Sequence, residues 1–270
     1  MQPKNVSMKP AIVMTGASSG IGRELARLAA RESGVVLLVG RDRKALDELA
    51  AELNGDGGAQ AHAFAVDLAD RDAGQRIEDK LAAIGAYCDV LVNSAGFGVF
   101  GAAAETDRQE HLKLIDVNIR ALTELTLRFL PGMIARRRGG VLNVGSITGY
   151  APGPNMSTYF ASKAYVQSFT AALAAEVAGT GVTVTCLAPG VVRTAFFERC
   201  AAGRTYMVKL APRANAPETA AAGWRGWRAG KRLVIPRLIN RVIVGGAIIL
   251  PRAIVVRIVA VLLQLRREAL

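Results

Sequence analysis

The feature that most constrains the fold is a regular alternation: from Ala11 onward, short apolar runs alternate with longer stretches of helical periodicity. Within those stretches apolar residues recur every three or four positions, as Leu46, Leu49 and Leu53 do. The apolar runs are rich in Val, Leu and Ile, which is typical of parallel strands covered on both faces. This order predicts an α/β fold with a doubly wound, parallel sheet of about seven strands, whose ligands bind beyond the carboxyl ends of the strands. We expect strands at residues 11–16, 35–40, 61–67, 89–96, 140–146, 182–190 and 231–236, and helices at residues 23–31, 44–53, 73–84, 107–133 and 159–178.

The size and the cysteine content narrow the class of protein. A chain of 270 residues with 51% hydrophobic residues can bury one large core. Cys88, Cys186 and Cys200 lack the spacing of metal ligands, and an odd number without a secretory signal argues against a disulfide framework. The residues before Ala11 hold no apolar stretch long enough for a signal peptide. We therefore expect a reducing cytosol, no structural metal and no export.

A glycine-rich turn follows the first expected strand directly. Its sequence, TGASSGIG, runs from Thr15 to Gly22, and a periodic helix begins at Arg23. Glycines allow positive φ and let a phosphate approach the backbone, while the start of a helix offers unpaired N–H groups and the positive end of its dipole. Such a turn can also be an ordinary tight connection. Its place between the first strand and the first helix favours dinucleotide binding, and hence a Rossmann-like sheet.

The ends of the second and third expected strands predict how the adenosine half of a dinucleotide is held. An acidic residue after the second strand would bond the ribose 2′-hydroxyl, whereas an arginine suits a 2′-phosphate. Arg41 stands in this position, which favours NADPH over NADH. The alternative is that Arg41 is solvated and Asp42 is a helix N-cap. Asp67, after the third strand, is expected either to accept a bond from the adenine amino group or to cap the next helix.

The residues that carry chemistry follow the fifth expected strand. Ser146 ends this strand, and the next helix begins with Tyr159, followed one turn later by Lys163 on the same face. A phenol has an ordinary pKa of about 10, which a nearby ammonium and an oxidised nicotinamide would lower toward working pH. Tyr159 can then exchange a proton with a substrate oxygen. In isolation, the pair would be better explained as a half-buried tyrosine beside a lysine that reaches solvent.

Together these motifs resemble those of the short-chain dehydrogenase/reductase family over about residues 10–200. The motifs are TGASSGIG from Thr15, NSAG from Asn93, DVN ending at Asn118, Ser146, YFASK from Tyr159 and PGVVRT from Pro189. One position departs from the family pattern, which usually has a second asparagine where this chain has Ser94. The catalytic set that the resemblance implies is complete, so we expect an active enzyme. Its members are Asn118, Ser146, Tyr159 and Lys163.

The resemblance also implies a role for each residue. It implies that Ser146 hydrogen-bonds the substrate oxygen and that Tyr159 is the acid or base. Lys163 would bind the nicotinamide ribose and lower the pKa of the tyrosine, while Asn118 would hold a water that links Lys163 to solvent. The segment from Pro189 would pass under the nicotinamide, with the Val192 backbone and the Thr194 hydroxyl on its carboxamide. The implied cofactor-binding residues are Thr15, Gly16, Ser18, Ser19, Gly20, Ile21, Gly22, Arg41, Asp67, Leu68, Asn93, Ala95, Gly96, Tyr159, Lys163, Pro189, Gly190, Val192 and Thr194.

The segments expected to line the substrate pocket are mainly apolar. They are Phe97, residues 147–158, and the segment after Thr194, which begins Ala195, Phe196, Phe197. Residues 147–158 include no Arg or Lys that could hold a small carboxylate or phosphate. We therefore expect NADPH-dependent reduction of a carbonyl, or oxidation of the matching alcohol, on a hydrophobic substrate such as a lipid or 3-oxoacyl group. Two alternatives stay open: an NADPH-sensing protein that docks without turnover, and a non-redox epimerase or dehydratase of the same fold.

The last part of the chain is strongly basic. Residues 1–203 hold 21 Lys and Arg against 20 Asp and Glu, whereas residues 204–270 hold 13 against 2, which gives +1 and +11. Arginines interrupt every apolar run from residue 237 onward, so we expect no simple membrane-spanning helix. A helix from Arg252 would be amphipathic. It would gather Arg252, Arg257, Gln264 and Arg267 on one side, and Ile254, Ile258, Val261, Leu262 and Leu265 on the other.

Two interpretations of this extension stay open. Either its helices rest on an anionic membrane surface, with Trp224 and Trp227 near the boundary, or they pack over the substrate cleft or a partner subunit. Nucleic acid fits poorly, because long aliphatic residues separate the basic ones and the sequence offers no aromatic stacking platform. We expect residues 1–212 with strand 231–236 to form the dinucleotide-binding catalytic domain, and residues 237–270 the basic helical extension. The expected setting is a homo-oligomer in the cytoplasm, at the inner membrane face if the extension binds lipid.

Overall fold

A parallel sheet of seven strands forms the centre of the computed structural model, which describes residues 8–32, 34–55 and 59–264. The strand order is β3-β2-β1-β4-β5-β6-β7, so the winding reverses between β1 and β4 and opens a crevice at their carboxyl ends. The predicted doubly wound α/β fold is confirmed. The last strand is shorter than predicted, because the chain turns away before Pro236, which has no N–H to donate. The strands are β1 (Lys9–Thr15), β2 (Val35–Gly40), β3 (Gln60–Ala65), β4 (Ala86–Asn93), β5 (Gly140–Val144), β6 (Thr183–Leu187) and β7 (Leu233–Val234).

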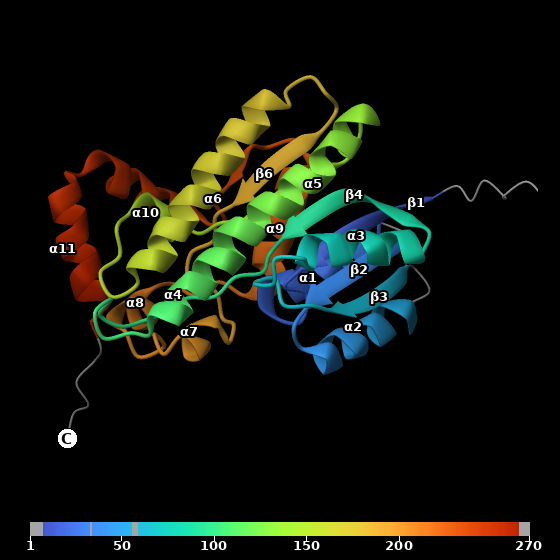
Figure 1. The fold of residues 1–270 in the computed structure, drawn as a ribbon. Helices are drawn as coiled ribbons and strands as arrows, with labels where there is room; N and C mark the ends of the chain where they lie inside the picture. The colour runs from blue at the N-terminus through green and yellow to red at the C-terminus, as the bar shows by residue number, and fades with distance from the viewer. Residues whose placement is uncertain (1–7, 33, 56–58, 265–270) are drawn as a thin grey trace, which may run out of the picture.

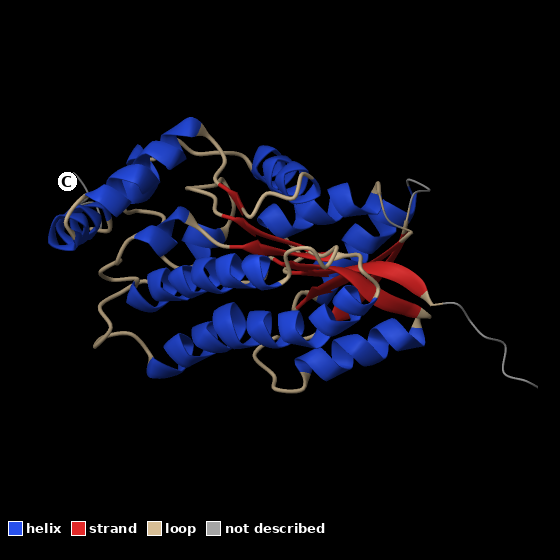
Figure 2. Ribbon diagram, turned by 90° about the horizontal axis from the view of Figure 1, so that it is seen from above, coloured by secondary structure: helices blue, strands red, loops and turns tan. Residues whose placement is uncertain are grey.

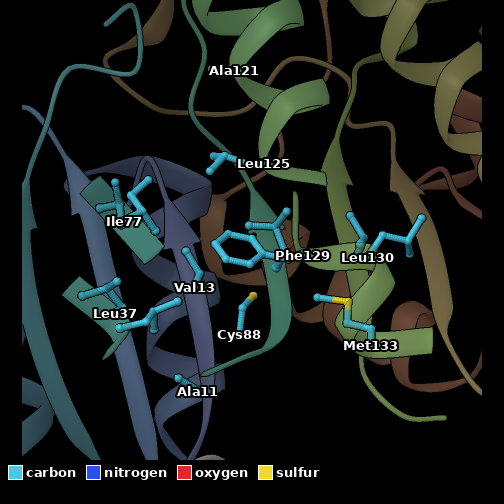
Figure 3. Close-up of a cluster of buried hydrophobic side chains, with 14 of the residues drawn as sticks. Ala11, Val13, Leu37, Ile77, Cys88, Ala121, Leu125, Phe129, Leu130 and Met133 are labelled. Carbon is cyan, nitrogen blue, oxygen red and sulfur yellow. The ribbon is translucent and has the colours of Figure 1, made fainter. Parts of the chain in front are cut away.

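Helices cover both faces of this sheet (Figure 2). Alternate residues of a strand point to opposite faces, so Val13 belongs to one core and Met14 to the other. Figure 3 shows the core on the face of Val13, where Ile77 and Phe129 pack over the strands. The helices over that core are α3 (Ala73–Ala83), α5 (Leu122–Ala135) and α6 (Ser157–Glu176). The helices over the opposite core are α1 (Gly20–Ala30), α2 (Arg43–Gly55) and α9 (Ala216–Arg228).

The region predicted as one helix over residues 107–133 is helical throughout but changes its winding. It begins as α4 (Arg108–Ile115), capped by Asp107, whose carboxylate accepts from the Gln109 N–H at 2.9 Å. A π-helical segment, η1 (Asp116–Ala121), follows and leads into α5. The side chain of Asn118 lies in this wider turn and is buried. Such turns are rare and often occur at functional sites.

The sequence pattern does not predict helix α9, which packs against α1 and β6. Trp224 and Trp227 of this helix are both buried, and the indole N–H of Trp224 donates to Glu32 at 3.0 Å. The expectation that these tryptophans lie near a membrane boundary is therefore wrong. A glycine allows the close packing, because a Cβ on Gly223 would lie 2.6 Å from a methyl group of Leu187.

Two helices follow the sheet and lie at the opposite end of the molecule from the start of β1 (Figure 1): α10 (Leu238–Ile249) and α11 (Arg252–Leu262). The predicted apolar side of α11, with Ile254, Ile258 and Val261, is its exposed side, whereas Val255 and Leu263 are buried. Leu265 and Arg267 lie outside the described residues. No helix in the described part of the chain combines the length and apolarity that crossing a membrane requires. The remaining short helices are η2 (Ile147–Tyr150), α7 (Phe196–Arg199) and α8 (Tyr206–Leu210).

Candidate active site

A cavity of about 750 Å³ lies at the carboxyl ends of the strands, where the reversal of the sheet predicts a ligand site. It brings together side chains and backbone from the glycine-rich turn, four strand ends, α6 and the segment after β6. Three predicted site residues, Thr15, Asn93 and Asn118, do not line it and lie behind its wall. The predicted residues that line it are Gly16, Ser18, Ser19, Gly20, Ile21, Gly22, Arg41, Asp67, Leu68, Ala95, Gly96, Ser146, Tyr159, Lys163, Pro189, Gly190, Val192 and Thr194.

The glycine-rich turn has the shape that a pyrophosphate group needs. Gly16 has φ of +68°, and a Cβ there would lie 2.7 Å from the Ala95 backbone nitrogen. A Cβ on Gly22 would lie 2.2 Å from the Gly16 carbonyl oxygen. Ser19 is the N-cap of α1, and its side chain makes no capping bond in the described structure. The first N–H groups of the helix, which belong to residues that line the cavity, are therefore not bonded by this side chain. The turn therefore fits a dinucleotide phosphate.

Thr15 and Asn93 hold the strand ends in register behind the cavity. Thr15 Oγ1 accepts hydrogen bonds from the Ser94 and Ala95 N–H groups at 3.1 and 3.2 Å. The Asn93 amide donates to Thr126 at 3.1 Å and to Asn143 at 2.9 Å. These bonds tie β1, β4, β5 and α5 together, so both residues act on the shape of the site and not through contact with its contents.

At the adenosine end of the cavity, Asp42 and Asp67 make bonds within the protein, whereas Arg41 is exposed. Asp42 Oδ1 accepts from the Ala45 N–H at 3.0 Å, so Asp42 caps α2, as the alternative interpretation of this segment expects. Arg41 is exposed at the cavity rim. Asp67 accepts from the Ala69 N–H and pairs with Lys113 at 3.1 Å. Burial works against ionisation of Asp67, but these bonds prevail and lower its pKa. Asp72, whose side chain makes no capping bond in the described structure, occupies the N-cap position of the next helix, so the alternative of Asp67 as its N-cap is wrong.

Ser146, Tyr159 and Lys163 are buried side by side at the other end of the cavity. The Tyr159 phenol lies beside the Ser146 side chain, and the Lys163 ammonium lies 5.8 Å from the centre of the phenol ring. Lys163 Nζ donates to the Val144 carbonyl at 2.8 Å. Burial raises the pKa of the Tyr159 phenol and outweighs the lowering effect of the nearby Ser146 and Thr148 side chains. Burial also lowers the pKa of Lys163 to about 8.

The predicted lowering of the tyrosine pKa therefore does not come from the protein's own groups in this structure. Buried and polarised, the three side chains can instead hold a proton on Tyr159 next to a substrate oxygen. The pKa values of the phenol and the ammonium are shifted in opposite directions by the same burial, since one is charged when it loses its proton and the other when it keeps it.

Asn118 connects the π-helical turn to this group. Its amide donates to the Phe97 carbonyl at 3.0 Å and to Ser162 Oγ at 3.1 Å, while its oxygen accepts from the Phe97 N–H at 3.1 Å. Phe97 lines the cavity, and Ser162 precedes Lys163 on α6. Asn118 thus fixes the loop after β4 against the helix that bears Tyr159 and Lys163.

Sequence reasoning missed two cations at the cavity. Lys113 pairs with Asp67, and Arg199 of α7 donates from Nη1 to Ser19 Oγ at 3.3 Å. Neither carries a motif, because exposed basic residues are frequent in this chain. A further wall comes from α10 and α11, which contribute Ile239, Ile243, Val259 and Leu262, in agreement with the interpretation that the extension packs over the substrate cleft.

The substrate half of the cavity is largely apolar, in agreement with the expectation from the loops. Phe97, Phe196 and Phe197 line it as expected, together with Ile147, Thr148, Ala151 and Met156 from residues 147–158. The ring of Phe196 also packs against that of Tyr159, tilted by 46° with the ring centres 5.2 Å apart. The proton-bearing group is thus enclosed by hydrocarbon on its substrate side.

Comparisons with known proteins agree with this arrangement. A family model described as short chain dehydrogenase matches residues 10–204, so α8 to α11 lie beyond it. Sulfoacetaldehyde reductase 2 of Chromohalobacter salexigens is 37% identical over 191 residues, which is 70% of this chain and 75% of that protein. A short-chain dehydrogenase from Sphingobium yanoikuyae in complex with NADPH is 30% identical with a TM-score of 0.78, over 88% of this chain and 93% of that one. The bulky-bulky ketone specific alcohol dehydrogenase from Comamonas testosteroni is 25% identical with a TM-score of 0.73, over 90% and 96%.

Proposed function

Since the chain belongs to the short-chain dehydrogenase/reductase family, it is a nicotinamide-dependent oxidoreductase of alcohols and carbonyls, and we propose that it reduces a hydrophobic carbonyl compound with NADPH. The observation that carries this proposal is the convergence of Ser146, Tyr159 and Lys163 on one cavity whose substrate half is largely apolar. The two structural neighbours named above agree with it, because one binds NADPH and the other is specific for bulky ketones.

The chain's own residues handle the proton and the orientation of the substrate. When bound, the nicotinamide supplies the hydride. Ser146 Oγ holds the substrate oxygen beside Tyr159, and the phenol of Tyr159 donates its proton to that oxygen. The nearby ammonium of Lys163 stabilises the phenolate that remains. The phenylalanines around Tyr159 exclude water, so the proton comes from the phenol and not from solvent.

The preference for NADPH rests on Arg41. Asp42 is occupied at the start of α2, whereas Arg41 lies exposed at the rim of the cavity beyond β2. A guanidinium there binds a 2′-phosphate with paired hydrogen bonds. Asp67, despite its bonds to Ala69 and Lys113, also lines the cavity and is proposed to accept from the adenine amino group.

The proposed substrate is hydrophobic, such as a long-chain ketone, aldehyde or 3-oxoacyl compound. Besides the phenylalanines, the lining includes Met156, Met207 and Leu210. Methionines adapt to irregular apolar shapes, which suits chains of variable length. A small acid would find no dedicated cation in residues 147–158 of this half of the site.

We also propose a homo-oligomer in a reducing compartment, and membrane contact through α10 and α11. Exposed Leu112, Ile115, Leu127 and Ile134 on α4 and α5 offer an apolar face for a second copy. The cysteines Cys88, Cys186 and Cys200 are free and buried, as suits the cytoplasm. Light scattering of the purified protein would measure its mass in solution, and a monomer at all concentrations would contradict the oligomer.

The proposal is tested by following NADPH consumption against ketones, aldehydes and acyl thioesters of increasing chain length. We expect turnover to rise with chain length and to fall at least about 100-fold in Tyr159→Phe, because general acid catalysis is worth that much. Tyr165→Phe is the matched control: it also lies on α6, but its hydroxyl bonds Thr123 outside the cavity. NADPH binding without turnover of any compound would favour a sensor. Substrate conversion without net NADPH consumption would favour an epimerase or dehydratase.

A further inference from the structure

The outer sides of α10 and α11 both carry exposed aliphatic side chains. On α10, Leu238, Val242 and Ile249 share the side opposite the buried Asn240 and Val244. Leu238 is 74% exposed and Ile249 is 83% exposed. We name this the α10–α11 surface and define it by Leu238, Val242, Ile248, Ile249, Leu250, Ile254, Ile258 and Val261. So many exposed aliphatic side chains on two consecutive helices indicate a binding face.

The same two helices form a wall of the substrate cavity. Ile239 and Ile243 of α10 line the cavity and are still 43% and 46% exposed, so they lie at its mouth. Val259 and Leu262 of α11 line it from the other helix. The same two helices therefore supply both the exposed α10–α11 surface and apolar residues at the mouth of the cavity.

The charges around this surface have one sign. Arg237, Arg241, Arg252 and Arg257 are all exposed. The sequence holds no Asp or Glu between Glu218 and Glu268. Arg237 and Arg241 do donate to the backbone carbonyls of Pro212 and Ile235, but a carbonyl leaves the positive charge in place. An aliphatic face bordered by arginines is complementary to an anionic lipid surface.

We propose that the α10–α11 surface docks on an anionic phospholipid bilayer and that lipophilic substrate enters the cavity from the bilayer, past Ile239 and Ile243. This inference rests on the proposed reduction of a hydrophobic carbonyl. A second copy of the chain is the weaker occupant, because pairing this face with itself would bring arginines of both copies together. The short helices agree with a surface position, since neither α10 nor α11 could cross the membrane.

The test compares vesicle binding with activity in the full-length protein. We expect the wild type to co-sediment with vesicles that contain phosphatidylglycerol but not with pure phosphatidylcholine. Ile249→Glu should need about tenfold more lipid for half-maximal binding, because one buried aliphatic side chain is worth about that factor. Ile249 is exposed and does not line the cavity, so the variant should fold normally. Ala51→Glu is the matched control, since it places the same charge on an exposed site of α2.

The activity arm separates this inference from the proposed function. Ile249→Glu should lose turnover of a long-chain ketone dissolved in anionic vesicles, yet keep wild-type turnover of a short, water-soluble ketone. Equal vesicle binding and equal activity of the variant and the wild type would overturn the docking proposal. So would a loss of oligomer mass in Ile249→Glu without any vesicle binding, which would assign the surface to a second copy. Vesicle binding by a protein that reduces no ketone would instead remove the proposed function and leave the docking intact.

Discussion

At the residue scale, the chemistry depends on how burial changes the protonation of two neighbouring groups. Tyr159 and Lys163 share one turn of α6, and the same hydrocarbon surroundings favour the neutral form of each. A neutral phenol can donate a proton during reduction, while the lysine remains close to the point of releasing its own. The pair is therefore set up for proton donation near neutral pH.

The pKa of Lys163 makes a prediction about stability. Its folded-state pKa is about 8, below the ordinary 10.5, so between these values the unfolded chain binds more protons and the free energy of unfolding rises with pH. We expect the unfolding free energy of the wild type, relative to Lys163→Met, to rise by on the order of 2 kcal/mol between pH 8 and 10. Urea unfolding of both proteins at several pH values measures this. Titrating groups that do not interact with Lys163, such as Cys88 and Cys200, cancel in the difference, whereas Cys186 interacts with Lys163 and does not. A flat difference would show that Lys163 is not dehydrated by burial.

Arg199 and Arg41 make a paired prediction about the cofactor. Arg199 reaches Ser19 at the helix start, beside the expected pyrophosphate, whereas Arg41 lies at the expected 2′-phosphate. Arg199→Ala should weaken NADPH and NADH binding alike, by about tenfold, as loss of a charged hydrogen bond does. Arg41→Ala should weaken NADPH binding only. Titration by nicotinamide fluorescence distinguishes the two, and an effect of Arg199→Ala on NADPH alone would place this arginine at the ribose.

The sequence predicts the site residues best where a motif and a strand end coincide. This coincidence predicts Gly16, Ser146, Tyr159 and Lys163, because a known chemistry needs these residue types at a known spacing. Arg199 could not be predicted, because its contact with Ser19 joins residues 180 positions apart and depends on how α7 folds back over the cavity.

At the element scale, α9 shows where periodicity fails as a signal. Its apolar positions are alanines, glycines and two tryptophans, so the sequence lacks the Leu and Val spacing that indicates other helices. Tryptophan is compatible with both a core and a membrane boundary, and only the close approach allowed by Gly223 decides for the core. By contrast, all seven strands could be predicted, because most are buried aliphatic runs and the two less buried ones, β3 and β7, fall in the same alternation of strands and helices.

The two tryptophans of α9 should differ in their contribution to stability. The Trp224 N–H bonds Glu32, whereas the buried Trp227 N–H has no partner among the described residues. Replacing each by phenylalanine removes similar volume, so Trp224→Phe should be more destabilising by about 1 kcal/mol, the value of one hydrogen bond. Denaturant unfolding of both variants checks the order. Equal losses would indicate that Trp227 has a partner such as a bound water.

At the scale of the whole molecule, one wall of the cavity comes from a part of the chain that the family match does not include. The family match ends at residue 204, but the cavity wall continues to Leu262. Helix α10 also touches the cofactor half, because Asn240 packs against Gly190 so closely that a Cβ there would lie 2.5 Å from its side chain.

Removing residues 237–270 should therefore weaken substrate binding while NADPH binding remains. We expect a folded protein that still binds NADPH, because the glycine turn, β1 to β7 and α9 remain. The KM for hydrophobic ketones should rise at least about tenfold, since each lost aliphatic contact is worth about 1.5 kcal/mol. Steady-state kinetics and circular dichroism measure both effects. An unchanged KM would mean that α10 and α11 do not enclose the substrate.

The burial of Cys88, Cys186 and Cys200 has a practical consequence for studying this protein. Burial raises the pKa of all three thiols, that of Cys186 to about 11, so little reactive thiolate forms in the native state at neutral pH. A cysteine introduced at Ile249 would then react alone with a maleimide dye, without removal of the native thiols. In the native state the three buried thiols should hardly react with such a dye. Any slow labelling of these thiols therefore measures how often the core opens.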